Sequence, residues 1–178
     1  MPNQFAIDVE KLRTQAREHM ERGAVTPAYG TSVDQVVSVL NDVVATEIVC
    51  WARYQQHAIV AAGIDRAQVA DEFKEHAGEE MQHAMWAAER INQLGGTPDF
   101  TPSTLAQRAH TEYKVFQETD LTGMLKENLV AERIVIQSYQ EIIRWLGDSD
   151  PTTRRILERI LEQEEEHADD LNTLLSAR

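Results

Sequence analysis

The chain has 178 residues, a formal net charge of −13, a single cysteine, eight glycines and five prolines. This length fits one domain with a sizeable core, and the scarcity of glycine and proline favours long helices over a strand-rich fold. The acidic balance argues against a nucleic-acid partner, because phosphate binding depends on clustered Lys and Arg. Cys50 alone cannot form an intrachain disulfide or a cysteine-based zinc or rubredoxin-type iron site.

Residues 1–4 lack the basic start and apolar centre of a signal peptide. The sequence also shows no run of about 18 apolar residues that would span a bilayer. We therefore expect a cytoplasmic protein without a membrane partner. The basic residues of the first 30 positions are balanced by acidic ones, so a DNA-binding tail is not expected either.

The first predicted element is a short amphipathic helix within an N-terminal arm over residues 1–30. Apolar residues at helical spacing support it, and Gly23 ends it. These apolar positions are Phe5, Val9, Leu12, Ala16 and Met20.

Four long helices are predicted in the remaining chain, residues 31–178. Their expected bounds are 32–62, 65–94, 120–146 and 151–177. Ser32 suits the first cap, glycines follow the ends, and Pro151 suits a first helical turn. The connection over residues 95–119 is long enough to cross the bundle and contains a candidate short helix at 103–110. Because the other connections are short, the expected topology is two hairpins joined by a long crossover.

One pattern occurs twice in these helices: a Glu, a Tyr seven residues later, and a Glu-x-x-His on the next helix. The first copy comprises Glu47, Tyr54, Glu80 and His83, and the second comprises Glu132, Tyr139, Glu164 and His167. Each copy is a helical hairpin that brings its groups to similar heights. The two hairpins are therefore expected to be related by a pseudo-two-fold axis.

All four glutamates of the repeat interrupt apolar helix faces, as judged from residues three, four and seven positions away. Burying unpaired carboxylates costs several kcal/mol each, and neighbouring carboxylates also repel. A domain stable by only about 5–15 kcal/mol needs compensation for this cost. Two divalent cations cancel four carboxylates in charge and leave both imidazoles as neutral donors. The sequence therefore predicts a dinuclear metal site.

This donor set resembles that of ferritin-like proteins, most strongly bacterioferritins and Dps-like miniferritins with a bacterioferritin-type site inside one subunit. The resemblance covers residues 32–177, and the matching segments are 40–54, 79–84, 129–133 and 164–167. It implies an all-α ferritin-like four-helix bundle with two iron ions per subunit. In the implied assignment, Glu47 and His83 are terminal ligands of one iron, Glu132 and His167 of the other, and Glu80 and Glu164 are bridges.

Several side chains near this pattern allow two interpretations. Tyr54 either packs with its hydroxyl paired or takes part in redox steps beside the metals, as the resemblance implies. We interpret His76 as a hydrogen-bonded core or channel histidine rather than a seventh ligand, and Cys50 as a small buried hydrophobe. Five glutamates that neighbour the pattern are interpreted as surface residues, with iron carriage along an entry path as the alternative; they are Glu79, Glu127, Glu162, Glu165 and Glu166.

Met81 matches the methionine that binds haem between two bacterioferritin subunits. Relatives without haem share this methionine, and an apolar dimer face is the alternative interpretation that we favour. The residues of that face would be Gly78, Met81, Met85 and Ala88. Haem therefore stays the less favoured possibility.

The sequence predicts a ferroxidase that oxidises Fe(II) with peroxide or dioxygen and stores Fe(III) in a hollow homo-oligomer. The sequence departs from the bacterioferritin pattern, because it shows no fifth helix after residue 177 and has a longer crossover and an N-terminal segment. These departures favour a dodecamer over a cage of twenty-four subunits. The alternatives are a di-iron oxidase or oxygenase acting on an organic substrate, a haem-containing bacterioferritin 24-mer, and a metal-free interaction bundle.

Overall fold

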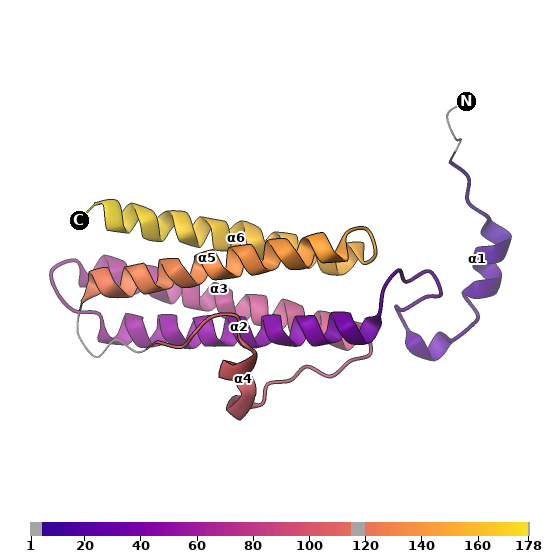
Figure 1. Cartoon of the computed structure of the whole chain (residues 1–178), viewed down its shortest axis with the longest axis horizontal. Helices are drawn as coiled ribbons and strands as arrows, with labels where there is room; N and C mark the ends of the chain where they lie inside the picture. The colour runs from indigo at the N-terminus through magenta and orange to yellow at the C-terminus, as the bar shows by residue number, and fades with distance from the viewer. Residues whose placement is uncertain (1–4, 115–119, 178) are drawn as a thin grey trace.

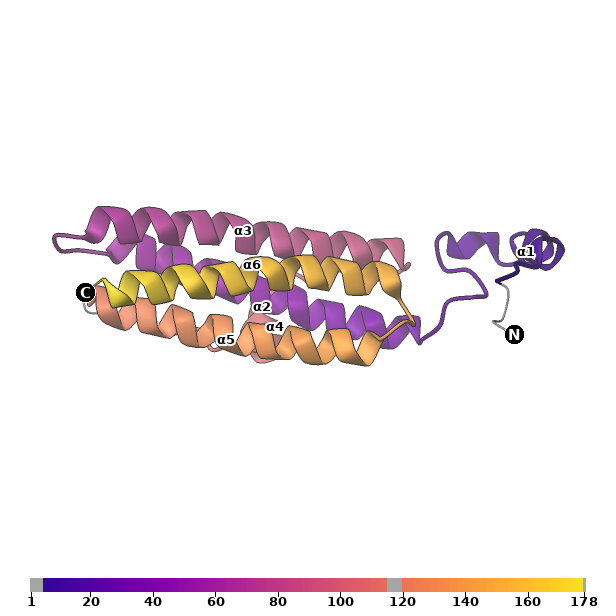
Figure 2. The same ribbon diagram turned by 90° about the horizontal axis from the view of Figure 1, so that it is seen from above.

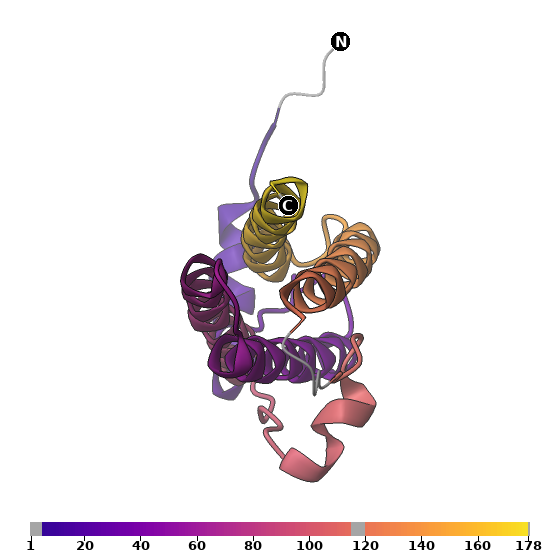
Figure 3. The same ribbon diagram turned by 90° about the vertical axis from the view of Figure 1, so that its left-hand side faces the viewer.

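The computed structural model describes residues 5–114 and 120–177. Every regular element in these residues is a helix. Four long helices lie side by side as a bundle (Figure 1), which is seen end-on in Figure 3. They are α2 (Val33–Val60), α3 (Arg66–Gln93), α5 (Leu121–Leu146) and α6 (Pro151–Ser176). The predicted all-α four-helix fold is confirmed.

The helices begin and end at the signals that the sequence provides. Ser32, Asp120 and Asp150 each accept a hydrogen bond from a backbone N–H in the first turn of α2, α5 and α6. Gly63 follows α2 with a φ of +106°, and Gly147 follows α5 with a φ of +48°. Both values lie in the left-handed region that glycine adopts without strain. The predicted helix bounds are therefore close to the observed ones.

The topology is two antiparallel hairpins, α2–α3 and α5–α6, joined by a long crossover. After α3, the chain returns along the outside of α2, where the short helix α4 (Pro102–Arg108) packs (Figure 1). Helix α5 then starts at the end of the bundle where α3 starts, so these two helices run in the same direction (Figure 2). Residues 115–119 of the predicted crossover lie outside the described residues.

The core consists of two apolar clusters that are separated along the bundle by a polar layer. One cluster lies toward the start of α2 and includes Leu40, Val43, Ile91, Leu157 and Ile160. The other lies toward the end of α2 and includes Phe73, Met124, Leu125 and Leu171. Because both ends of the polar layer are closed by packed side chains, polar groups between the clusters are shielded from solvent.

Helix α2 is long enough and apolar enough to cross a membrane when judged by length and composition alone, and it is the one such helix among the described residues. The sequence analysis did not expect a stretch of this kind. Half of the apolar window is buried inside the bundle. Since α2 contacts α3, α4 and α5, the same composition is expected of a helix that lies at the centre of a packed core.

The N-terminal arm is less helical than predicted. Helix α1 spans only Val9–Gln15, and the 3-10 turn η1 (Met20–Arg22) follows it. Between them, His19 has a φ of +51°, which interrupts any continuous helix. The apolar residues that predicted an amphipathic helix ending at Gly23 are exposed, with Phe5 at 86% and Met20 at 75%. The apolar pattern therefore has no buried partner surface within the described chain, and the division into an arm and a bundle domain stays a prediction.

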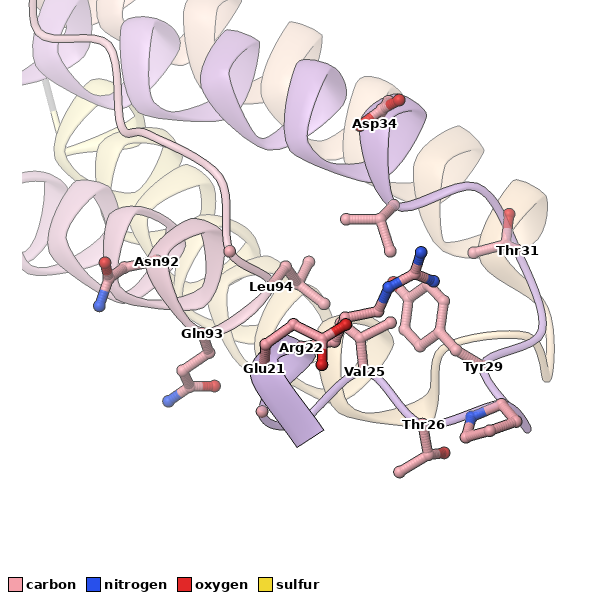
Figure 4. A pocket seen from close by; sticks show the side chains of 14 residues that line it. Glu21, Arg22, Val25, Thr26, Tyr29, Thr31, Asp34, Asn92, Gln93 and Leu94 are labelled. Atoms are coloured by element: carbon pink, nitrogen blue, oxygen red, sulfur yellow. The ribbon is translucent and has the colours of Figure 1, made fainter. Parts of the chain in front are cut away.

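A surface pocket lies where the arm meets the end of α3 (Figure 4). Arg22, Val25 and Tyr29 line it from the arm, and Leu94 lines it from the end of α3. None of the six predicted ligands belongs to its walls. The Tyr29 hydroxyl donates a hydrogen bond to Asp150 (2.6 Å), which ties the arm to the start of α6.

Candidate metal centre

The six predicted donors converge in the polar layer between the two apolar clusters. Each of the four long helices supplies one glutamate, and α3 and α6 also supply one histidine each. The donors are all buried, with 0% of the residue exposed for five of them and 2% for the last; they are Glu47, Glu80, His83, Glu132, Glu164 and His167. The structure thus brings together every residue of the predicted ligand set.

The donors form two overlapping sets. Within each set, one donor atom per residue lies within 4.8 Å of the others. The first set is Glu47, Glu80, His83 and Glu164, and the second is Glu80, Glu132, Glu164 and His167. Glu80 and Glu164 belong to both sets, which is the position that a bridging carboxylate requires. Two cations held by these sets would therefore be neighbours.

The atoms that face the middle of the layer lack the hydrogen bonds that buried polar atoms normally make. They are Oε2 of Glu47 and Glu132, both carboxylate oxygens of Glu80 and Glu164, and Nδ1 of His83 and His167. Leaving such groups without partners costs about 1–3 kcal/mol each, and more for charged groups. Metal ions bound between them would accept these lone pairs, so the residues present fit a pair of cations.

A hydrogen-bonded chain behind the histidines orients their rings. His83 donates from Nε2 to Gln163 Oε1 (3.1 Å), and His167 donates from Nε2 to Glu79 Oε2 (2.7 Å). Gln163 Nε2 in turn donates to Glu79 Oε1 (3.1 Å). With Nε2 engaged in this way, each ring directs Nδ1 at the glutamates, and Nδ1 is the nitrogen available to a metal.

Glu79 and Gln163 are the functional residues that the sequence analysis missed. Glu79 was interpreted as a surface residue, and its side chain is 38% exposed, yet it holds His167. Gln163 was not singled out. Each residue directly precedes the glutamate of a Glu-x-x-His motif, so the repeat itself carried a signal that could have found them.

Each repeat tyrosine holds the terminal glutamate of the other hairpin. The Tyr54 hydroxyl on α2 donates to Glu132 Oε1 on α5, and the Tyr139 hydroxyl on α5 donates to Glu47 Oε1 on α2. Burial and the nearby carboxylates raise the pKa of both tyrosines well above the usual range. Both hydroxyls therefore keep their protons and act as donors.

Burial dominates the electrostatics of the layer. Burial, followed by repulsion from Glu164 and Glu80, raises the pKa of Glu47 well above its usual range, and burial with the same two neighbours raises the pKa of Glu132. Burial by itself lowers the pKa of His83, but the carboxylates of Glu164 and Glu47 beside Nδ1 outweigh it and raise that pKa to about 11. Protons thus compensate the charges when cations are absent, and metal binding must release them.

The residues considered for haem lie on α3 outside this layer. Gly78 and Met85 are exposed and Met81 is partly exposed, whereas Ala88 is buried in the core at 4% exposure. The predicted apolar face therefore does not include Ala88, because that side chain packs inside the bundle. Haem binding by Met81 stays a prediction.

Replacing Glu79 by alanine is expected to weaken metal binding by about 10- to 100-fold, because outer partners of ligating histidines typically contribute that much. Titration with Co(II), followed by its visible absorption, measures the change. Glu75→Ala, an exposed position one turn earlier on α3, is the matched control and should bind as the unmodified protein does. Equal affinity of the two variants would contradict a role for Glu79 in holding His167.

Two helical hairpins, a long crossover and a buried carboxylate–imidazole layer define the class of ferritin-like bundles. In agreement, residues 37–177 match the ferritin-like domain family, and the chain belongs to this family. Its buried glutamates and histidines suit iron binding.

Relatives come from both the Dps and the bacterioferritin groups. The "Nutrient stress-induced DNA-binding protein" of Synechococcus sp. is 30% identical over 142 residues, which cover 78% of this chain and 80% of that protein. Bacterioferritin of Desulfovibrio desulfuricans is 28% identical over 134 residues, covering 75% and 70%. The solved structure of a dodecameric thioferritin, the bacterioferritin-related protein from Bacteroides fragilis, has a TM-score of 0.80 and 35% identity, covering 83% and 88%.

Proposed function

We propose that this protein is a ferroxidase that oxidises Fe(II) at the paired donor sets and stores the Fe(III) inside a hollow homo-oligomer. The observation that carries the proposal is the sharing of two buried glutamates, Glu80 and Glu164, between two complete donor sets. Carboxylate and imidazole donors suit iron and favour its oxidised form. Iron is the substrate and the cargo in this proposal.

The chemistry requires two ions side by side. Each Fe(II) gives up one electron, and one peroxide molecule accepts two electrons and two protons to form two water molecules. Glu80 and Glu164 would hold both ions next to one another, so that a single oxidant receives both electrons. Tyr54, hydrogen-bonded to Glu132, is the proposed additional redox-active side chain. Dioxygen is the alternative oxidant.

Anaerobic titration with Fe(II), followed by peroxide and by light scattering on the same sample, tests the proposal. We expect about two ions per chain to be oxidised rapidly, as the two donor sets suggest. Further Fe(II) should then be taken up into a large particle. Failure to oxidise any iron faster than buffer does would contradict the proposed activity.

A di-iron oxidase of an organic substrate is the competing function. It requires a pocket beside the metals, but the pocket at the arm and the smaller pockets over α3, α5 and α6 are lined by none of the six donors. Rapid oxidation of two ions per chain with no further uptake would support the oxidase instead.

A dodecamer is the proposed assembly. The relative from Bacteroides fragilis, whose structure is described as dodecameric, supports it at 35% identity. The net charge of −13 supports the further proposal that the assembly does not bind nucleic acid, although the name of the Synechococcus relative refers to DNA binding. A cytoplasmic location is proposed on the sequence alone.

A further inference from the structure

A second cluster of metal-ligating side chains lies next to the paired donor sets, between α3 and α6. It consists of Glu72, His76 and Asp170, whose donor atoms lie within 4.8 Å of one another. His76 Nε2 is 3.4 Å from Glu72 Oε1 and 3.7 Å from Asp170 Oδ2. The sequence analysis interpreted His76 as a hydrogen-bonded core or channel histidine, and it did not consider the two carboxylates.

The hydrogen bonds of His76 determine which ring nitrogen faces the carboxylates. The Tyr54 hydroxyl has one proton and donates it to Glu132. Its oxygen can therefore only accept from His76 Nδ1, which lies 3.2 Å away. Nδ1 must carry the proton of that bond, so Nε2 is the atom left to face Glu72 and Asp170.

This arrangement directs a buried nitrogen at two negative groups. His76 is 2% exposed, whereas the side chains of Glu72 and Asp170 are 28% and 46% exposed. The cluster is therefore closed on the inside by the ring and open to solvent on the outside. A lone pair and two carboxylates repel one another, and a cation between them would remove this repulsion. One imidazole nitrogen with two carboxylates suits a divalent first-row metal ion.

The cluster is in direct contact with the paired site. The His76 ring stacks on His167, with centroids 4.0 Å apart and an interplanar angle of 20°. It also reaches Glu132 through the Tyr54 hydroxyl. An ion held by Glu72 and Asp170 would thus lie between solvent and one terminal histidine of the paired site.

The second hairpin does not reproduce this cluster. Relative to the Glu-x-x-His motif, the positions matching Glu72, His76 and Asp170 are Ile156, Ile160 and Trp86. Ile160 is fully buried, and the Trp86 ring is covered by the Arg159 guanidinium, 3.8 Å from the ring centroid. The equivalent position on the other side of the donor layer therefore packs with apolar residues, and the bundle architecture does not require three polar side chains beside the layer.

We propose that Glu72, His76 and Asp170 bind a third divalent cation. In this protein the cation is Fe(II), which binds there as it moves between solvent and the paired site. The binding of the ion depends on these three donors alone, so it is separable from the ferroxidase activity. The route for Fe(II) rests on the proposed function.

Crystals of the full chain soaked in Co(II), a stand-in for Fe(II) that air does not oxidise readily, test the binding. Anomalous difference maps should show an ion among Glu72, His76 and Asp170 in addition to ions at the paired site. The double variant Glu72→Gln/Asp170→Asn should lose only that additional ion. Glu75→Gln/Asp169→Asn removes the same charge from exposed positions of the same helices, and this control should keep every ion.

The outcomes separate the two proposals. A filled paired site without the additional ion would overturn the third site. The additional ion without any ion at the paired site would overturn the proposed function and leave the third site intact. Retention of the additional ion by Glu72→Gln/Asp170→Asn would also overturn the assignment.

Steady-state oxidation tests the route. Glu72→Gln/Asp170→Asn should raise the KM for Fe(II) by about 10-fold, the low end of what charged clefts contribute to association rates. Its kcat should stay unchanged, because no ligand of the paired site is altered. The Glu75→Gln/Asp169→Asn control should keep both constants. An unchanged KM in the first variant would overturn the route.

Discussion

The double variant Glu47→Ala/Glu132→Ala is expected to lose the fast phase of iron oxidation, by at least about 100-fold. Each donor set loses its terminal carboxylate, and even outer partners of metal ligands typically contribute about 10- to 100-fold. Stopped-flow absorbance after mixing with Fe(II) and peroxide measures the loss. A fast phase that survives in this variant would contradict the ligand assignment. Glu89→Ala/Glu162→Ala, at two exposed positions, is the control and should keep the fast phase.

A second variant separates charge from packing. Glu47→Gln/Glu132→Gln keeps the side-chain volumes and an oxygen for each tyrosine hydroxyl. Because burial raises the pKa of both glutamates, glutamine resembles the protonated form, and the metal-free stability should change little. The unmodified protein should gain about 2.7 kcal/mol when free metal is at 100 times its Kd. The variant should lose this gain, as measured by urea unfolding with and without Co(II).

Asp150→Ala is expected to reduce the free energy of unfolding by about 3–5 kcal/mol, the usual cost of removing one partner of a buried ion pair. Arg90 Nη2 lies 3.0 Å and 3.2 Å from the two carboxylate oxygens of Asp150. Both residues are buried, at 6% and 2% exposure. Asp150 also caps α6 and accepts a hydrogen bond from Tyr29. Urea unfolding followed by circular dichroism measures the loss.

Two control variants and the pH dependence of stability test whether the Arg90–Asp150 ion pair causes this loss. Asp150→Asn keeps the cap but not the charge, so its loss should be smaller, and Asp148→Ala at a fully exposed side chain should have little effect. Burial raises the pKa of Asp150, but bonds from Thr153 and Tyr29 and the charge of Arg90 outweigh it and lower that pKa. The stabilisation is therefore fully present above the unfolded pKa of about 3.9 and is lost as pH falls toward the folded value. Equal stability of Asp150→Ala and Asp148→Ala would contradict the buried ion pair.

The helices and the donor layer were predictable from the sequence because each depends on local pattern. Helix ends follow caps such as Ser32 and glycines such as Gly63. The donor layer follows from glutamates that interrupt apolar helix faces. Buried carboxylates need polar or charged partners, so the four glutamates are expected to lie together around bound cations. Similar spacing in the two hairpins, 33 residues from Glu47 to Glu80 and 32 from Glu132 to Glu164, then placed Glu80 and Glu164 at one height, where both belong to the two donor sets.

The hydrogen-bond partners of the histidines and the structure of the arm depend on contacts between segments, which the pattern within one helix does not predict. Gln163 lies directly before Glu164, which marks it as a neighbour of the motif, but its contact with His83 on α3 follows only from the packing of the two helices. The arm was overpredicted for a related reason. An apolar face such as that of Leu12 indicates a helix only if something covers it, and within the described chain Leu12 stays 49% exposed.

The hydrogen bonds of Tyr54 and Tyr139 run from each hairpin to the other, so the bundle resembles a dimer of two hairpins joined by the crossover. Each half contributes one end carboxylate, one shared carboxylate and one imidazole, and each tyrosine supports the opposite half. Two separate copies of one such half, docked about a two-fold axis, would present the same donor layer without the crossover. The two halves therefore need to match at the donors and their tyrosines but can differ at neighbouring positions, as they do where Ile160 takes the place that corresponds to His76.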